Sequence, residues 1–188
     1  VFVEKGFRDA TVAEICRRAG ANISAVNYYF GSKKALYQEA WRHSFAESIA
    51  AHPQDGGVSE AAPPEERLRG QVKALIERIA DESSKDFFIS QMEFANPTGL
   101  LHEVMKSELI PLREKTLSVV RELLGPEATE EQVALCETCI LGMCMHPLLM
   151  QRARQRLKIP EAPVVIHDLG AYIEHVMKFA LAGIRAIR

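Results

Sequence analysis

The stretch TVAEICRRAGANISAVNYYFGSKKAL, residues 11–36, predicts two short helices joined by a tight turn and followed by the start of a third helix. Thr11 and Glu14 can each reach the other's backbone N–H in a capping box, which places the start of the first helix at Thr11. Gly20 can adopt the left-handed conformation that ends a helix. A helix, a turn containing Gly and a second short helix form a helix-turn-helix motif, whose second helix enters the major groove of DNA.

The second helix, at roughly residues 23–29, has an unusual exposed face. It carries small, amide and aromatic side chains where a solvated helix would carry Lys and Glu: Ile23, Ser24, Ala25, Asn27, Tyr28 and Tyr29. Asn can pair with adenine, Ser can donate or accept a hydrogen bond, and Ile and Ala can contact a thymine methyl group. Lys33 and Lys34 follow in the first turn of the next helix, where a bound phosphate would offset the unfavourable helix dipole. Together these features favour DNA binding over an ordinary helical hairpin.

The segment TVAEICRRAGANISAVNYYFGSKKALYQEA resembles the signature of TetR-family transcriptional regulators, and AVNYYFGSK resembles the CecR-like branch of that family. The resemblance covers about the first 48 residues. Asn27 stands where the family more often has Tyr, and Gly31 stands where Pro is common, which leaves the operator sequence open. The resemblance implies an all-α, cytoplasmic, homodimeric regulator, usually a repressor, that binds a palindromic operator in double-stranded DNA and is released by a small molecule.

The DNA-binding residues follow from the motif and from the resemblance. We expect base contacts from the start and the exposed face of the second helix, namely Asn22, Ile23, Ser24, Ala25 and Asn27. The matching family positions imply phosphate contacts from Thr11, Tyr28, Tyr29 and Lys33. The formal net charge of the whole chain is −2. Residues 1–50, however, carry seven Lys and Arg against five acids, so the basic character lies where the motif is.

Two domains are expected, with the change near residue 50. The segment AAHPQDGGVSEAAPPEE, residues 50–66, has no helical periodicity and reads as an exposed connection. It separates a helix-turn-helix DNA-binding domain, residues 1–48, from a ligand-binding and dimerisation domain, residues 49–188. The first helix of the DNA-binding domain is expected to be largely missing, because Phe2 and Val3 read as its last turn.

The rest of the chain shows helical periodicity almost throughout. Residues 133–150 are apolar on nearly every side, so this helix should be buried on every side, and Pro147 should interrupt it. The last helix is also strongly apolar on one face. The family resemblance implies that the last two helices pair with those of a second copy. No run of 18 apolar residues occurs, and we expect no membrane span.

A small-molecule pocket is the second candidate site. Met and Phe form adaptable apolar walls, and a buried His can orient a polar group, although for any single one of these residues a place in an ordinary core is favoured. The residues that could line a pocket for an apolar or amphipathic effector are Phe87, Phe88, Met92, His102, Met105, Met143 and His146. We expect the pocket near Pro97 and Pro111, and we expect no cofactor.

A redox or metal-sensing regulator is the alternative function, acting through Cys136, Cys139 or Cys144. Cys136 and Cys139 lie one helical turn apart, but Cys144 and His146 point about 200° apart on a helix and no second CxxC completes a metal site. We therefore expect no metal, and we interpret the thiols as small apolar groups at a tight helix interface. No phosphate loop, nucleophile elbow or carboxylate pair indicates an enzyme.

Overall fold

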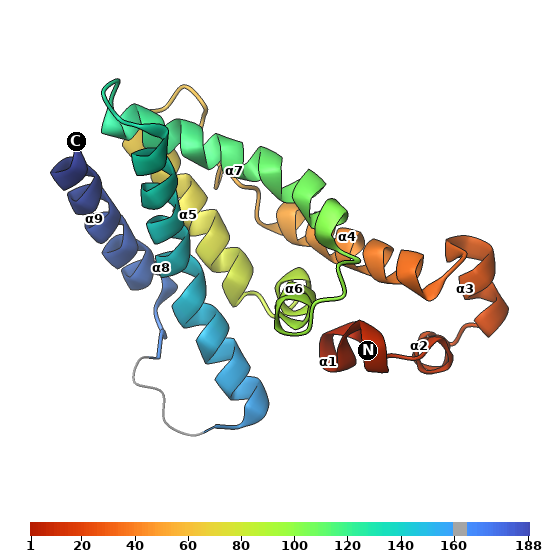
Figure 1. The fold of residues 1–188 in the computed structure, drawn as a ribbon. Coiled ribbons are helices and arrows are strands. Elements are labelled where there is room, and N and C mark those ends of the chain that lie inside the picture. Colours follow the sequence, from red (N-terminus) through yellow and green to blue (C-terminus); the bar gives the residue numbers. More distant parts are fainter. Residues whose placement is uncertain (160–164) are drawn as a thin grey trace. The chain divides into compact units, whose positions relative to one another are not determined.

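The computed structural model describes residues 1–159 and 165–188, and over these residues the chain forms nine helices and no strands (Figure 1). The all-α class is therefore confirmed. In chain order, the helices are α1 (Phe2–Asp9), α2 (Val12–Ala19), α3 (Ile23–Phe30), α4 (Lys33–Ala51), α5 (Pro64–Ala80), α6 (Asp86–Ala95), α7 (His102–Leu124), α8 (Glu130–Leu157) and α9 (Leu169–Ile187).

The chain forms two compact units. The first unit contains Val1–Ala50 and Ser83–Leu109, and the second contains Ala51–Glu82 and Ile110–Arg188. The first unit therefore includes α6 and the start of α7 in addition to the helix-turn-helix. The domain division at residue 48 remains our proposal.

The predicted helix boundaries around the helix-turn-helix have clear physical causes. The backbone N–H of Glu14 donates to Thr11 Oγ1 at 3.2 Å, which caps α2, and Gly20 ends α2 in the left-handed region with φ 64°. The reciprocal half of the expected capping box is absent from the bonds described, because the Glu14 carboxylate instead accepts hydrogen bonds from Lys5 and Arg18. The second predicted capping box, between Thr129 and Gln132, forms in full at the start of α8.

The core of the first unit joins α4 to α6. Tyr37 and Trp41 of α4 are almost fully buried. The Tyr37 hydroxyl donates to Glu93 Oε2 at 3.2 Å, and Trp41 Nε1 donates to Ser90 Oγ at 2.9 Å. Glu93 is itself buried and also accepts hydrogen bonds from the backbone N–H groups of Thr98 and Gly99. This one carboxylate thus fixes α4 and the turn after α6.

Helix α1 packs on α6 in the same unit. Gly6 lies inside α1 at φ 66° and ψ −170°, a non-helical conformation that kinks the helix. A Cβ atom on Gly6 would lie 3.3 Å from Met92 Cε, so the glycine also admits the Met92 side chain. The kink therefore seats α6 directly against α1.

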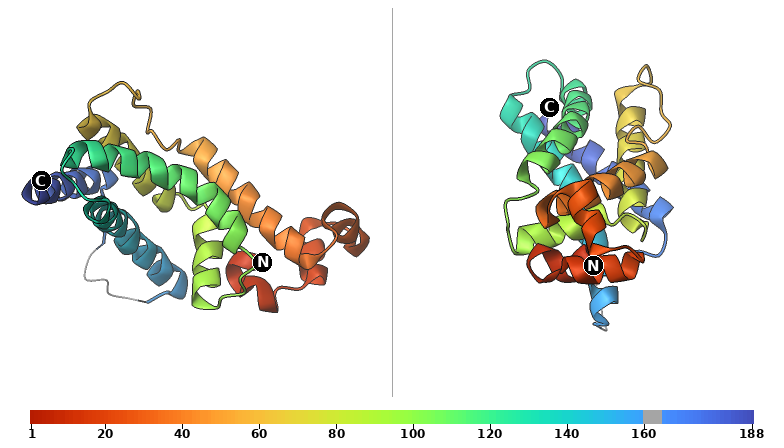
Figure 2. Two further views of the ribbon diagram at one scale, coloured as in Figure 1. Left: turned by 45° about the horizontal axis from the view of Figure 1, so that its top comes forward. Right: turned by 90° about the vertical axis from the view of Figure 1, so that its right-hand side faces the viewer.

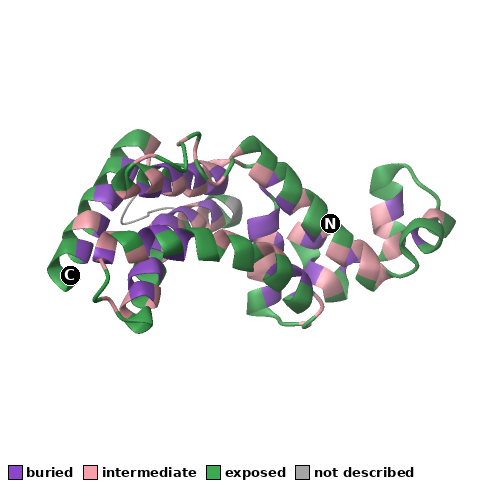
Figure 3. Ribbon diagram, turned by 90° about the horizontal axis from the view of Figure 1, so that it is seen from above, coloured by how far each residue is buried: buried purple, intermediate pink, exposed green. Residues whose placement is uncertain are grey.

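In the second unit, α5, α8 and α9 pack side by side (Figures 1 and 2). Buried residues recur along one side of α9 and around much of α5 (Figure 3), and the buried residues of this unit include Ile76, Val133 and Val176. The connection before α5 packs on Gly70, because a Cβ atom there would overlap the carbonyl oxygen of Asp55. Arg113 of α7 pairs with the buried Glu137 of α8 at 3.2 Å.

Helix α8 differs from two expectations. It continues through Pro147 to Leu157 without interruption. It is also not buried on every side within one chain, because Leu135 and Cys139 are exposed. An 18-residue window within Glu130–Gln155 has a mean hydropathy of 1.6, so length and composition alone would let this helix cross a membrane. The core helix of a protein that spans no membrane can meet the same criterion, so this is weak evidence for a span.

Candidate nucleic-acid interface

Helix α3 is held against α2 by a small buried contact. Val26 is the buried residue of α3, and Cys16 is the buried residue of α2. The Cys16 thiol donates to the carbonyl oxygen of Asn22 at 3.6 Å, which ties α2 to the turn before α3. Helix α3 thus packs on α2 with Val26 buried and the thiol contact at its start, and most of its remaining surface is exposed.

The exposed surface of α3 consists of uncharged side chains. Ile23 is 52% exposed and Tyr28 is 83% exposed, and the Tyr28 ring makes an edge contact with Tyr29 at 4.9 Å between centroids. Ser24 and Asn27 are also exposed, and Ala25 is partly buried. An exposed, uncharged helix face with two protruding tyrosines suits contact with base edges and with the sugar-phosphate backbone.

The two asparagines of the motif are used differently. Asn22 is the N-cap of α3, and its Oδ1 accepts a hydrogen bond from the backbone N–H of Ser24 at 3.0 Å. The Asn27 side chain makes no hydrogen bond within residues 1–50, all of which the structure describes, so its amide keeps both its acceptor and its donors. Only Asn27 therefore retains the full hydrogen-bonding capacity of an amide.

The cations of the motif are also held differently. Lys33 Nζ donates to the carbonyl oxygen of Arg8 at 3.3 Å and lies 4.5 Å from the centroid of the Phe7 ring. Lys33 is thus fixed on α1, and only part of its side chain faces solvent. Lys34 and Arg17 are exposed, and no partner is seen for either in the described part of the first unit. These two residues are the cations that a phosphate can approach without breaking a contact.

An ion-pair network joins α1 to α2. Arg18 donates to both carboxylate oxygens of Glu4 at 2.7 Å and to Glu14 at 2.9 Å, and Lys5 donates to Glu14 at 2.6 Å. The hydrogen bond from Lys5, together with Arg18, lowers the pKa of the Glu14 carboxyl, and the two carboxylates raise the pKa of Arg18. Lys5 and Arg18 therefore help to hold α1 against α2, and a DNA phosphate would have to compete with these carboxylates for them.

The predicted pocket residues fall in both units. Phe87, Phe88, Met92, His102 and Met105 lie in the first unit, and Met143 and His146 lie in the second. Phe87 and Met105 are buried, and Met92 lies against Gly6 of α1. His102 and His146 are both exposed, so the expectation of a buried, orienting histidine is wrong at these two positions. Contact of any of these seven residues with an effector remains a prediction.

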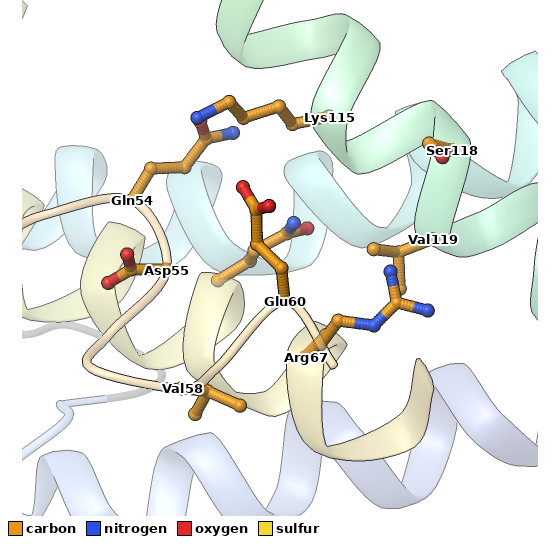
Figure 4. Close-up of a pocket in the computed structure, with 9 residues that line it drawn as sticks. Gln54, Asp55, Val58, Glu60, Arg67, Lys115, Ser118 and Val119 are labelled. Carbon is orange, nitrogen blue, oxygen red and sulfur yellow. The ribbon is translucent and has the colours of Figure 1, made fainter. Parts of the chain in front are cut away.

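Sequence reasoning missed a hollow of about 320 Å³ in the second unit. Figure 4 shows its lining of polar side chains and two valines, which comes from the connection before α5, from α5 and from α7: Gln54, Asp55, Val58, Glu60, Arg67, Gln71, Lys115, Ser118 and Val119. Gln54 is anchored there, because its Nε2 donates to the carbonyl oxygen of Leu112 at 2.6 Å. Nothing in the sequence indicates this hollow, since an irregular segment carries no periodicity that would predict what it covers.

The cysteines lack the setting of reactive thiols. Burial raises the pKa of the Cys144 thiol to about 12, and burial also raises the pKa of Cys136. A thiol is nucleophilic and binds metal as a thiolate, so both residues are protonated and inert near neutral pH. Cys139 is exposed. Among the residues that the structure describes, no three His, Cys, Asp or Glu side chains are arranged to hold a metal ion.

Two family models match the chain. Residues 64–184 match the C-terminal domain of the HTH-type transcriptional dual regulator CecR, and residues 1–40 match the bacterial regulatory proteins of the tetR family. The first match covers more than half of the chain.

Relatives and solved structures agree with these models. The chain is 29% identical over 147 residues to the HTH-type transcriptional dual regulator CecR of Shigella flexneri, across 71% of this chain and 65% of that protein. It is 32% identical over 83 residues to the HTH-type transcriptional regulator BetI of Stenotrophomonas maltophilia (strain R551-3), across 43% of this chain and 38% of that protein. Each alignment thus spans less than two thirds of the relative.

The fold is shared with the fatty acid degradation regulator FadR from Bacillus halodurans. The two structures align with a TM-score of 0.69 at 20% sequence identity, and the alignment covers 97% of this chain and 93% of FadR. This similarity bears on the fold alone. The matched families consist of DNA-binding transcriptional regulators rather than enzymes. With its N-terminal helix-turn-helix and the domain that follows, this chain belongs to the TetR family of bacterial transcriptional regulators and carries a C-terminal domain of the CecR type.

Proposed function

We propose that the chain is a cytoplasmic, ligand-responsive repressor that binds a palindromic operator as a homodimer and leaves it when a small molecule binds. The observation that carries the proposal is the exposed, uncharged face of α3, a helix that packs on α2 and has a capped start. In a helix-turn-helix protein, this face enters the major groove.

The contacts with DNA divide into two groups. We propose that Ile23, Ser24, Ala25 and Asn27 contact base edges, and that Asn22 contributes its remaining amide N–H groups. Thr11, Tyr28, Tyr29 and Lys33 hold phosphates and set the register of α3, a role that carries no sequence information by itself. In a dimer, two such helices read half-sites about one helical turn or a multiple of it apart.

The dimer would form through α8 and α9. Leu135 of α8 and Phe179 of α9 are large apolar side chains that the single chain leaves exposed. Exposed apolar surface of this kind on two long neighbouring helices is typical of a helix-bundle interface. The exposure of Leu135 and Phe179 therefore supports the interface that the family resemblance implies.

The effector would be apolar or amphipathic. Buried phenylalanine and methionine side chains of the first unit, including Phe87 and Met105, support this assignment. The effector can release DNA only if it binds the DNA-free arrangement more tightly than the DNA-bound one.

Selection of operators from random duplex DNA tests the proposal. The protein is expected to enrich a palindrome with two half-sites, and sedimentation of the complex is expected to show two chains on each duplex. If the protein is a folded dimer but neither enriches a sequence nor binds duplex DNA, the proposal is contradicted.

A further inference from the structure

Helix α3 has no cation. Its sequence, ISAVNYYF, contains neither Lys nor Arg, so the recognition helix cannot make the bidentate contact to the O6 and N7 atoms of guanine. That contact is the most common specific contact in the major groove. The base preference of this helix must therefore come from amide, hydroxyl and apolar side chains.

The side-chain amide of Asn27 is the one group on the helix that can recognise a base with two hydrogen bonds. Recognition of adenine needs an acceptor for the N6 amino group and a donor for N7. Asn22 is held at the start of α3, because its Oδ1 accepts the backbone N–H of Ser24 at 3.0 Å, and its amide cannot turn toward an adenine without giving up this cap. Asn27 is exposed, and its amide is free of hydrogen bonds within the described residues of the first unit.

Ile23 lies one helical turn before Asn27, on the same side of α3. Its side chain is 52% exposed at the first position of the helix, where residues of a recognition helix meet base edges. In the major groove, an exposed branched aliphatic group can be removed from water favourably by packing against the C5 methyl group of thymine.

From these observations we infer that α3 reads A·T base pairs, with Asn27 paired to an adenine and Ile23 packed against the methyl group of a thymine. The inference rests on the proposed operator binding and adds the base composition of the half-site. The two residues are about 6 Å apart along the helix axis. Because base pairs are about 3.4 Å apart, the adenine and the thymine lie within two base-pair steps of each other.

Base analogues in the DNA test the inference without altering the protein. In each half-site of the selected operator, one thymine at a time is replaced by uracil, and one adenine at a time by 7-deazaadenine. Uracil at the Ile23 contact is expected to weaken binding roughly fourfold, the value of one buried methyl group. 7-Deazaadenine at the Asn27 contact removes one acceptor of a bidentate pair and is expected to weaken binding by at least about fivefold.

Protein variants assign each effect to its residue. Ile23→Ala should bind the thymine and uracil operators equally, and Asn27→Ala should be indifferent to 7-deazaadenine. Phe94→Ala on α6, at an exposed position outside the proposed DNA contacts, is the control, and it should keep both differences. Circular dichroism confirms that each variant is folded before its affinity is compared.

The outcomes separate this inference from the proposed function. An enriched palindrome whose affinity tolerates uracil at every thymine, or whose conserved core contains only G·C pairs, overturns the inference and leaves the regulator intact. Analogue effects that persist in Ile23→Ala and Asn27→Ala also overturn it. A protein that enriches no sequence overturns the proposed function and this inference together.

Discussion

Asn22 and Asn27 are the same residue type five positions apart, yet the structure uses their amides differently. The Oδ1 atom of Asn22 caps the start of α3, whereas the side chain of Asn27 is exposed and its amide makes no such bond. A similar contrast holds between Lys33, which is fixed on α1, and Lys34, which is exposed. Residue type alone therefore does not identify a DNA contact, because neighbouring backbone groups compete for the same side chains.

At the residue scale, Lys33→Ala should affect both stability and DNA binding. The variant loses a cation–π contact with Phe7 and a hydrogen bond to Arg8, which should lower the free energy of unfolding by about 1 kcal/mol. Lys34→Ala is the matched control, because its exposed side chain should leave stability unchanged. Urea denaturation of both variants measures the difference, and equal stabilities would contradict the role assigned to Lys33.

The Glu14 carboxylate should make stability dependent on pH on the acid side. Its pairing with Lys5 and Arg18 lowers its pKa in the folded state from the ordinary value of 4.5. A group with a depressed folded pKa stabilises the protein above its unfolded pKa and loses that contribution as pH falls through the folded pKa. Glu14→Gln should therefore be less stable than the native chain near pH 7, and the difference should shrink below about pH 4.5. Thermal unfolding at several pH values tests this, and a difference independent of pH would disprove it.

At the scale of single elements, local signals in the sequence predict best. The cap at Thr11, the Gly20 stop and the capping box at Thr129 depend on residues within one turn of each other, and all three are present. The Glu14 carboxylate also pairs with Lys5, which lies on α1, and no local sequence pattern predicts this contact between two helices. The exposure of His102 and His146 and the polar hollow beside Gln54 likewise depend on distant elements. The positions of the α3 residues on their helix face were predictable, whereas their hydrogen-bond partners were not.

The close packing of the connection before α5 should make Gly70 intolerant of a side chain. Ala at this position would place a Cβ atom on the backbone of Asp55, so the connection must move. Overpacking of this kind costs about 1–3 kcal/mol. We expect Gly70→Ala to lower the free energy of unfolding by that amount, and Lys73→Ala, one turn along the exposed side of α5, to change it little. A fully stable Gly70→Ala chain would show that the connection is not held by this contact.

At the scale of the whole molecule, we propose that a second copy of the chain covers the apolar surface of α8 and α9. Phe179 is 65% exposed on α9 and should be buried in the dimer. A charge at this position would be desolvated on association, so Phe179→Glu should raise the dimer dissociation constant by at least about tenfold. Phe94→Glu on α6 is the control, because Phe94 is 71% exposed but lies outside α8 and α9. Analytical ultracentrifugation distinguishes the two, and equal effects of the two substitutions would rule out the α8–α9 interface.

We propose above all that α3 reads bases while cations of residues 1–50 hold phosphates. The most direct measurement is the affinity for the selected operator and for random duplex DNA, determined against salt concentration for the native chain and for Asn27→Ala. The native affinity should fall steeply with salt, and Asn27→Ala should keep that slope but lose part of its preference for the operator. A flat salt dependence, or an operator preference unchanged in Asn27→Ala, would contradict the claim.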